Sequence, residues 1–395
     1  MSSTLLGGLS NGEFLSQYWQ KKPLLVRGAF ADFTDPLSPD ELAGLAMEPD
    51  IKARLVFEKG RRPWQLLHGP FSETRLRRLP KSHWSLLVSR VNEYCEPAAA
   101  ILDKFKFIPH WRCDDLMVSF APPQGTVGAH VDSYDVFLIQ GKGRRLWQIQ
   151  EKPRPELVPE IDLKILKHFN PEAEWVLEPG DMLYLPPGVA HYGVALEDCM
   201  TYSVGFRAPS HGDLWRELFN MPHNLWETLS AEKMYSDPDL SEQENPGLLG
   251  GDAIAKLSAI LAEPLKHPEI IGRWLGAYLT KDQSNSRGSG TSRRLTASVL
   301  EKRLAKGQVG RADDVRVAYL APVGERFSFF VGGEEHSLDI RLLPLVQEIC
   351  ATRKVEGASL VKALPRAAKA REGALAFLSE LFRGGLLFFC VRDRL

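Results

Sequence analysis

Short apolar runs separated by turn residues dominate the middle of the first half of the chain. The runs are rich in β-branched, aromatic and aliphatic residues and are bounded by glycine, proline and aspartate, which is typical of strands. The predicted strands cover 116–120, 135–140, 144–149, 182–186 and 200–207. Two glycines in 141–143 predict a hairpin that pairs 135–140 with 144–149. Short strands with such turns predict a jelly-roll barrel of the cupin type.

The segment before this barrel has a mixed pattern. Residues 18–29 are expected to be a helix end that runs into a strand. Helical patterns, with Trp64, Trp84 and Trp111 between them, then lead to the barrel.

Helical periodicity replaces the strand pattern after residue 209. Leu214, Trp215, Leu218 and Phe219 fall on one face of a helix, and further helices are predicted at 253–261 and 269–279. Serine, glycine and asparagine in 283–292 predict a flexible linker. Beyond it we expect a hairpin at 326–338, helices at 342–353 and 371–382, and a strand at 386–391. This order resembles a winged helix.

Charge supports a division into three modules, at 1–208, 209–283 and 284–395. The net charge is only −1, but acidic residues outnumber basic ones in 209–283 and basic residues are in excess in 284–395. The acidic helical segment is too small to bury much core alone, so we expect it to pack on a second copy in a homodimer. The basic module could bind nucleic acid. A protein-contact module with a solvated basic face is the favoured interpretation.

Composition excludes several classes of protein. With 44% hydrophobic and 25% charged residues, the chain has the composition of a soluble globular protein. No apolar run is long enough for a membrane span, and the first residues lack the pattern of a signal peptide. Five scattered cysteines indicate neither a disulfide framework nor a zinc site. We therefore expect a cytoplasmic protein with reduced thiols.

One motif indicates metal chemistry. His130 and Asp132 stand at i and i+2, and side chains with that spacing share a face of a strand. His191 follows just after the turn 186–188. Two histidines and one carboxylate on separate strands can bind non-haem Fe(II) and leave coordination positions open. Alone, the His-x-Asp tripeptide is equally compatible with exposed residues near a loop, and the surrounding strands favour the metal.

An iron centre of this kind needs a reductant such as a 2-oxo acid, whose far carboxylate requires a cation on the barrel wall. Arg145 is a candidate because a guanidinium can bind a carboxylate through two hydrogen bonds. Arg144 is the alternative, since neighbouring residues of a strand point to opposite faces. Ser119 and Thr201 are weaker candidates for hydrogen bonds to the same co-substrate.

Five motifs together resemble the JmjC-type ribosomal oxygenases. They are Tyr18-Trp19 with Lys22-Pro23-Leu24-Leu25-Val26, the stretch 114–120, His130–Phe137, Gly143–Trp147 and Pro186–His191. The resemblance covers the whole chain and the order of its modules. It implies an α+β protein: a double-stranded β-helix, a helical dimerisation region and a C-terminal winged-helix-like domain.

The resemblance also implies an activity. It is strongest to bacterial members that hydroxylate an arginine of large-subunit ribosomal protein sixteen, with Fe(II) as cofactor and 2-oxoglutarate converted to succinate and CO2. His130, Asp132 and His191 match the family's iron ligands, and Arg145 matches its 2-oxoglutarate anchor. The family's substrate-binding positions fall on Asp115, Met117, Tyr134 and Ser203.

The residues alone leave some alternatives open. Asp114 could replace Asp115 as the acid that holds the substrate guanidinium. A histidyl hydroxylase of another ribosomal protein would need neutral polar groups at that position. A non-catalytic cupin regulator that uses the basic C-terminal module is the alternative from another class, and the intact ligand set argues against it.

Overall fold

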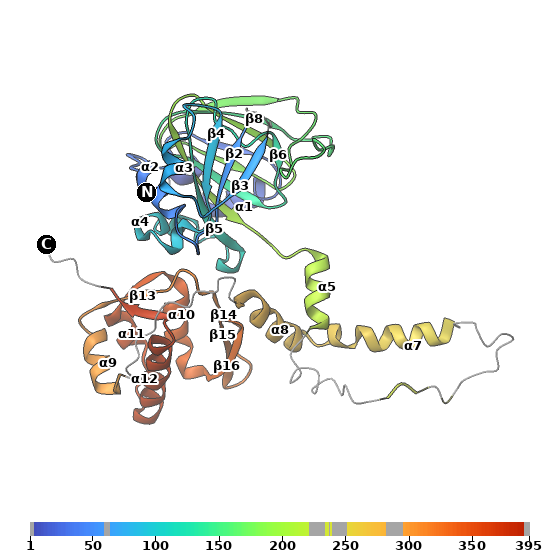
Figure 1. The fold of residues 1–395 in the computed structure, drawn as a ribbon. Helices are drawn as coiled ribbons and strands as arrows, with labels where there is room; N and C mark the ends of the chain where they lie inside the picture. Colours follow the sequence, from blue (N-terminus) through green and yellow to red (C-terminus); the bar gives the residue numbers. More distant parts are fainter. Residues whose placement is uncertain are drawn as a thin grey trace. The chain divides into compact units, whose positions relative to one another are not determined.

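The computed structural model describes residues 4–58, 64–220, 234–236, 238, 251–281 and 295–390, apart from the side chain of Phe219. The chain divides into two compact units, Met1–Ala208 and Pro209–Leu395 (Figure 1). The first boundary coincides with the one expected from charge and pattern. The predicted linker 283–292 lies outside the described residues.

Two antiparallel sheets form the body of the first unit. The larger sheet has the strand order β1-β10-β7-β12-β5-β4-β2-β3 and the smaller one β6-β11-β8-β9. In sheet order, the larger sheet consists of Leu24–Val26, Met182–Leu185, Asp135–Gln140, Cys199–Phe206, Cys113–Ala121, Trp84–Val88, Ala53–Phe57 and Gln65–His68. The smaller sheet consists of His130–Val131, Ala190–Ala195, Arg145–Gln150 and Ala173–Leu177. This is the two-sheet architecture expected of a jelly roll.

One predicted pairing is wrong. Strand β7 pairs with β10 and β12 in the larger sheet, whereas β8 pairs with β11 and β9 in the smaller sheet. The glycine turn 141–143 therefore carries the chain from one sheet to the other and does not close a hairpin. As a consequence, β8 lies beside the strand that bears His191.

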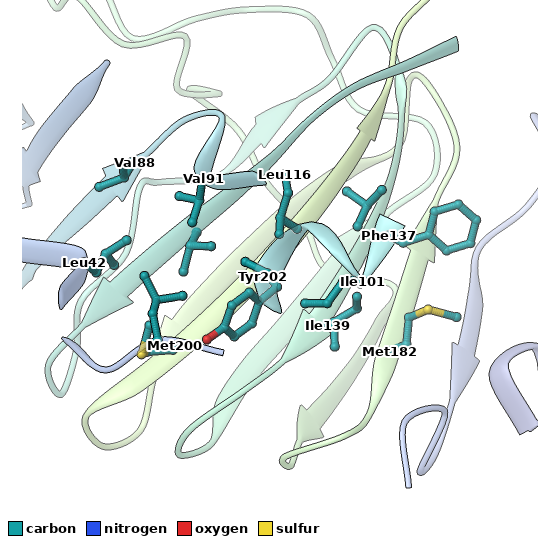
Figure 2. Close-up of a cluster of buried hydrophobic side chains, with 14 of the residues drawn as sticks. Leu42, Val88, Val91, Ile101, Leu116, Phe137, Ile139, Met182, Met200 and Tyr202 are labelled. Atoms are coloured by element: carbon teal, nitrogen blue, oxygen red, sulfur yellow. The ribbon is translucent and has the colours of Figure 1, made fainter. Parts of the chain in front are cut away.

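The outer face of the larger sheet carries the main core. Alternate residues of β12, among them Met200 and Tyr202, point away from the smaller sheet and join side chains such as Phe137 of β7 (Figure 2). Short helices cover this face with Phe14 and Leu42, each fully buried. Their bounds are Asn11–Gln17 (α1), Pro39–Leu45 (α2), Glu73–Arg77 (α3) and Glu96–Ala99 (α4). The inner face is left to line the barrel.

The region before the barrel is less helical than its pattern predicts. Strands β2, β3 and β4 extend the larger sheet there, although α2, α3, α4 and the 3-10 turns Val91–Glu93, Leu102–Phe105 and His110–Arg112 are present. All five residues of β4 are buried, so its apolar run lacks the alternation that marks a half-exposed strand.

Three predicted helices are present in the second unit: α5 (His211–Phe219), α7 (Gly251–Ala262) and α8 (Pro268–Thr280). Leu214 and Leu218 of α5 pack on Ile270 and Trp274 of α8. Trp215 instead lies 66% exposed. The other side of α8 contacts a small sheet of β14 (Val317–Tyr319), β15 (Arg326–Val331) and β16 (Glu334–Asp339). The hairpin predicted at 326–338 is confirmed.

The remainder of the second unit surrounds a core that also includes Val317 of β14 and Phe327 and Phe329 of β15. A three-stranded sheet, β17-β13-β18, packs with four helices. The strands are Lys354–Glu356, Gln308–Arg311 and Leu387–Phe389 in that order, and the helices are Ala297–Leu304 (α9), Leu343–Ala351 (α10), Gly357–Ala363 (α11) and Ala368–Arg383 (α12). Among the described helices, none is long and apolar enough to cross a membrane. The five cysteines are free thiols.

Candidate functional site

A cavity of about 400 Å³ lies between the two sheets of the first unit. Inward residues of β5 and β12 form one wall, and inward residues of β8 and β11 form the other. Every site residue expected from the sequence lines this cavity: His130, Asp132, His191, Arg145, Ser119, Thr201, Asp115, Met117, Tyr134 and Ser203. The fold therefore brings together residues that are up to 88 positions apart, from Asp115 to Ser203.

The two histidines and Asp132 converge as the motif predicts. Strand β6 pairs with β11 so that His130 and His191 are direct neighbours, with ring centroids 4.2 Å apart. His191 Nε2 lies 3.7 Å from Asp132 Oδ2, and one ligand atom of each of the three residues lies within 4.8 Å of the others. Atoms bound to one ion at about 2.0–2.2 Å can be at most about 4.4 Å apart, so the 3.7 Å between His191 and Asp132 is compatible with a shared metal ion.

Backbone hydrogen bonds orient both imidazole rings. Nδ1 of His130 lies 3.0 Å from the carbonyl oxygen of Gly128, and Nδ1 of His191 lies 3.3 Å from that of Val189. Each Nδ1 then carries the proton, and each Nε2 keeps a lone pair for a metal. Burial, together with the neighbouring His130, lowers the pKa of His191 to about 4. A neutral imidazole is the form that binds metal.

Arg145 faces the cavity, and Arg144 does not. Arg145 is only 3% exposed, and its Nε and Nη2 have no hydrogen-bond partner among the described residues. Arg144 extends outward to Glu197, with Nε 3.0 Å from Oε1. A buried guanidinium with unpaired donors is costly without an anion. It therefore fits a carboxylate ligand that enters from the cavity.

Ser119 and Thr201 are direct partners in the β5–β12 ladder. Both side chains are less than 10% exposed and line the cavity. Thr201 Oγ1 also donates a long hydrogen bond of 3.4 Å to Gln140 Oε1. Two hydroxyl groups next to each other on the cavity wall can complete the hydrogen bonding of a polar ligand.

Asp115 and Asp114 have different surroundings. Asp114 forms an ion pair with Arg207, with Nε 2.8 Å from Oδ2. Asp115 accepts the backbone N–H of Arg90 at 3.0 Å, and no other described residue donates a hydrogen bond to its carboxylate. Burial, with the charge of Asp114 beside it, raises the pKa of Asp115. The geometry favours Asp115 as the acid available to a cationic ligand.

Tyr134, Met117 and Ser203 lie near this carboxylate. Met117 and Ser203 are paired across β5 and β12, two residues along the ladder from Ser119 and Thr201 and on the same inward face. The Tyr134 side chain lies close to both Arg207 and Asp132, and burial, together with the charge of Asp132, raises the pKa of Tyr134 to about 12. Tyr134 thus links the acidic end of the cavity to a potential metal ligand.

Among the cavity residues that were not predicted as site residues, three adjoin the predicted ones. Arg207 binds Asp114 and lies over the Tyr134 ring, with its guanidinium carbon 4.9 Å from the ring centroid. A Cβ atom at Gly205 would lie 3.8 Å from both Asp115 Oδ1 and Tyr134 Cε2. Trp147 follows Arg145 by two positions on the same inward face of β8. The available sequence signal was the alternation of strand residues. Trp147 follows Arg145 by two positions, and Gly205 and Arg207 follow Ser203 by two and four positions.

The donor set fits an iron cofactor. Two imidazoles and one carboxylate, partly buried in a cavity with space beside them, form the facial ligand set typical of non-haem Fe(II) oxygenases. The two unpaired guanidinium nitrogens of Arg145 in the same cavity fit an anionic co-substrate.

Comparison with known proteins agrees with this site. A model of the JmjC domain matches residues 100–214. Ribosomal protein uL16 3-hydroxylase of Escherichia coli (strain K12) is 42% identical over 272 residues, which is 69% of this chain and 71% of that protein.

Two solved structures extend the similarity to the full length. The X-ray structure of E. coli ycfD has a TM-score of 0.84 at 34% identity and covers 97% of this chain and 98% of that one. YcfD, a ribosomal oxygenase from E. coli in complex with cobalt and 2-oxoglutarate, gives 0.80 at 34% identity over 96% and 98%. The sequence motifs, the two-sheet barrel and these relatives agree, and the chain belongs to the JmjC-domain ribosomal oxygenases.

Proposed function

We propose that this protein hydroxylates an arginine side chain of a large-subunit ribosomal protein of the uL16 type. The observation that carries the proposal is the partly buried carboxylate of Asp115, which accepts a hydrogen bond only from the backbone N–H of Arg90 among the described residues and shares a cavity with the His130–Asp132–His191 cluster. Because a buried carboxylate binds a guanidinium far better than a neutral group, this cavity selects a cationic side chain. The E. coli relative that is 42% identical is named for uL16 hydroxylation.

Each residue has a role in this proposal. His130, Asp132 and His191 hold Fe(II), which with 2-oxoglutarate and oxygen supplies the C–H oxidation and releases succinate and CO2. Arg145 binds the far carboxylate of 2-oxoglutarate, with hydrogen bonds from Ser119 and Thr201. Asp115 fixes the substrate guanidinium, and Ser203 adds a hydrogen bond.

Met117 and Tyr134 would pack against the aliphatic stem of the substrate arginine. Since Asp115 holds the guanidinium at one end, the carbon presented to the metal lies part-way along that stem. Arginine suits this arrangement better than lysine, because a planar guanidinium can donate two hydrogen bonds to one carboxylate.

The helical segment and the C-terminal module of the second unit also have proposed roles. The α7 helix has no buried residue, and Ile254, Leu257, Ile260 and Leu261 are each about half exposed or more. We infer that this helix packs on a second copy in a homodimer. The winged-helix-like end would then serve protein contact rather than nucleic-acid binding, and modification of ribosomal proteins would take place in the cytoplasm.

The test compares matched uL16-type peptides with Arg, Lys or His at the target position. Purified protein with Fe(II), 2-oxoglutarate and oxygen should add about 16 Da, one oxygen atom, to the Arg peptide. His130→Ala should remove the activity and leave the thermal unfolding transition in place. Preferential oxidation of the His peptide would assign the chain to the histidyl hydroxylases. Binding of peptide without oxidation would favour a non-catalytic regulator.

A further inference from the structure

Trp147 carries a buried hydrogen-bond donor that the roles above leave unused. The residue lies in β8, is 5% exposed and lines the cavity. Its indole Nε1 has no hydrogen-bond partner among the described residues. A buried donor without an acceptor destabilises the fold, so such a group in a cavity points to a ligand.

The position of Trp147 identifies which ligand it can reach. The Arg145 guanidinium carbon lies 5.6 Å from the centroid of the indole ring, and the His191 ring centroid lies 5.9 Å from it. Trp147 therefore stands between the co-substrate anchor and a metal ligand. Two nitrogens of Arg145 also lack partners, so unused donors of two neighbouring side chains gather in this part of the cavity.

The neighbouring strand holds the indole in one orientation. Trp147 is the ladder partner of Gly193 in β11, and a Cβ atom at Gly193 would lie 2.7 Å from indole Cη2 and Cζ3 and 2.9 Å from Cε3. The six-membered ring thus packs directly over the glycine. Nε1 belongs to the opposite edge of the indole, so this packing leaves the N–H free to face away from β11.

We propose that the indole N–H of Trp147 donates a hydrogen bond to the far carboxylate of 2-oxoglutarate, beside the guanidinium of Arg145. This inference rests on the proposed function, since it takes 2-oxoglutarate as the ligand. Trp147 is then a specificity residue for the co-substrate. Gly193 is a positioning residue, because only the absence of a side chain there lets the indole lie flat.

The test removes the donor and keeps an aromatic ring. Trp147→Phe protein, loaded with Co(II) so that no turnover occurs, is titrated with 2-oxoglutarate in a calorimeter. The dissociation constant should rise roughly ten-fold, as expected for one hydrogen bond to a charged acceptor. Trp175→Phe is the matched control, because Trp175 is the ladder partner of Trp147 on β9 and does not line the cavity. Its affinity for 2-oxoglutarate should equal that of the wild type.

A second ligand separates a hydrogen bond from a packing effect. 2-Oxobutyrate has the same chelating end and no far carboxylate, so Trp147→Phe should leave its affinity unchanged. Equal losses for both ligands, or an unchanged affinity for 2-oxoglutarate, would overturn the assignment of Trp147 while the proposed function stands. A wild-type protein that binds Co(II) but no 2-oxoglutarate would overturn both. Co(II) affinity of Trp147→Phe should remain within about two-fold of wild type, since the metal ligands are untouched.

Discussion

At the scale of the residue, Asp115 has opposite effects on stability and on substrate binding. Burial raises its pKa in the folded protein, so the ionised carboxylate disfavours folding. A group of this kind contributes stability below its unfolded pKa, and that contribution is lost as pH rises through the folded pKa. At neutral pH, Asp115→Asn should therefore leave Tm unchanged or raise it, and the difference should vanish in acid.

The same substitution should lower kcat/KM for the Arg peptide by about ten-fold or more, because a charge-assisted contact is lost. Below the raised pKa of Asp115 the wild type should lose peptide affinity as well, whereas the variant should show no such pH dependence. Asp114→Asn is the matched control, since Asp114 is paired with Arg207. A larger loss in Asp114→Asn would transfer the guanidinium-binding role to Asp114.

Gly205 controls the space beside Asp115. A Cβ atom there would only touch Asp115 and Tyr134 at 3.8 Å, so alanine fits the fold. Valine also suits a strand but would extend into the space that we propose for the substrate stem. Since overpacking costs about 1–3 kcal/mol, Gly205→Val should raise KM for the Arg peptide roughly ten-fold, with 2-oxoglutarate affinity unchanged. Steady-state kinetics with both substrates check this, and an unaltered peptide KM would place the stem elsewhere.

Residue-level prediction from the sequence succeeds where strand period decides the outcome. Both His130 and Asp132 line the cavity, and Arg145 faces inward while Arg144 faces solvent, as alternation requires. Gly205 and Trp147 share the same alternation but carry no titratable group, so their period-two spacing places them on the inward face without marking them as site residues. Their importance comes from the distances to residues on other strands.

At the scale of elements, a buried cluster of hydrogen bonds connects the N-terminal segment to the barrel. Asp135, at the start of β7, is fully buried and accepts hydrogen bonds from Gln20 Nε2 at 2.9 Å, the Tyr184 hydroxyl at 2.7 Å and Arg112 Nη2 at 3.2 Å. Asp135→Ala would leave these three donors without their acceptor. Breaking a buried ion pair from one side costs about 3–5 kcal/mol, so the free energy of unfolding should fall by about that much.

Urea unfolding of the metal-free protein measures this loss. Asp135→Asn keeps an acceptor oxygen and should cost clearly less than alanine. Because Arg112 Nε also donates to the carbonyl oxygen of Arg207 at 3.0 Å, the alanine variant should weaken peptide binding as well. Equal stability of the alanine variant and the wild type would show that the cluster contributes no net stability.

The elements themselves are predicted with uneven success, for a physical reason. Helices 253–261 and 269–279 agree with α7 and α8 within two residues, because their periodicity is local. The turn 141–143 is also where predicted, but its composition shows only that the chain reverses. Which sheet the next strand joins depends on β11 and β9, which come later in the sequence.

At the scale of the whole molecule, the boundary after residue 208 follows from the change in pattern and charge. The packing of helices and strands within the second unit cannot be derived from that pattern. Arg273 of α8 binds Glu335 of β16 through both carboxylate oxygens at 2.8 and 2.9 Å, and Gly276 lies against Phe330 of β15. These contacts join residues about sixty positions apart, and no local sequence pattern predicts them. They cover α8 but leave the apolar side of α7 without a cover among the described residues.

This remaining surface leads to the last prediction, a homodimer through α7. Ile254, Leu257 and Leu261 follow one another at helical spacing and are 53%, 48% and 65% exposed. Replacing Ile254 and Leu257 with Asp should dissociate the dimer, because burying two carboxylates at an apolar contact is costly. Ala259→Asp adds a charge on the opposite face of α7, where the residue is also exposed, and should leave the dimer intact. Sedimentation of the full chain at micromolar concentration distinguishes these outcomes. A monomeric wild type, or equal effects of the two changes, would contradict assembly through this helix.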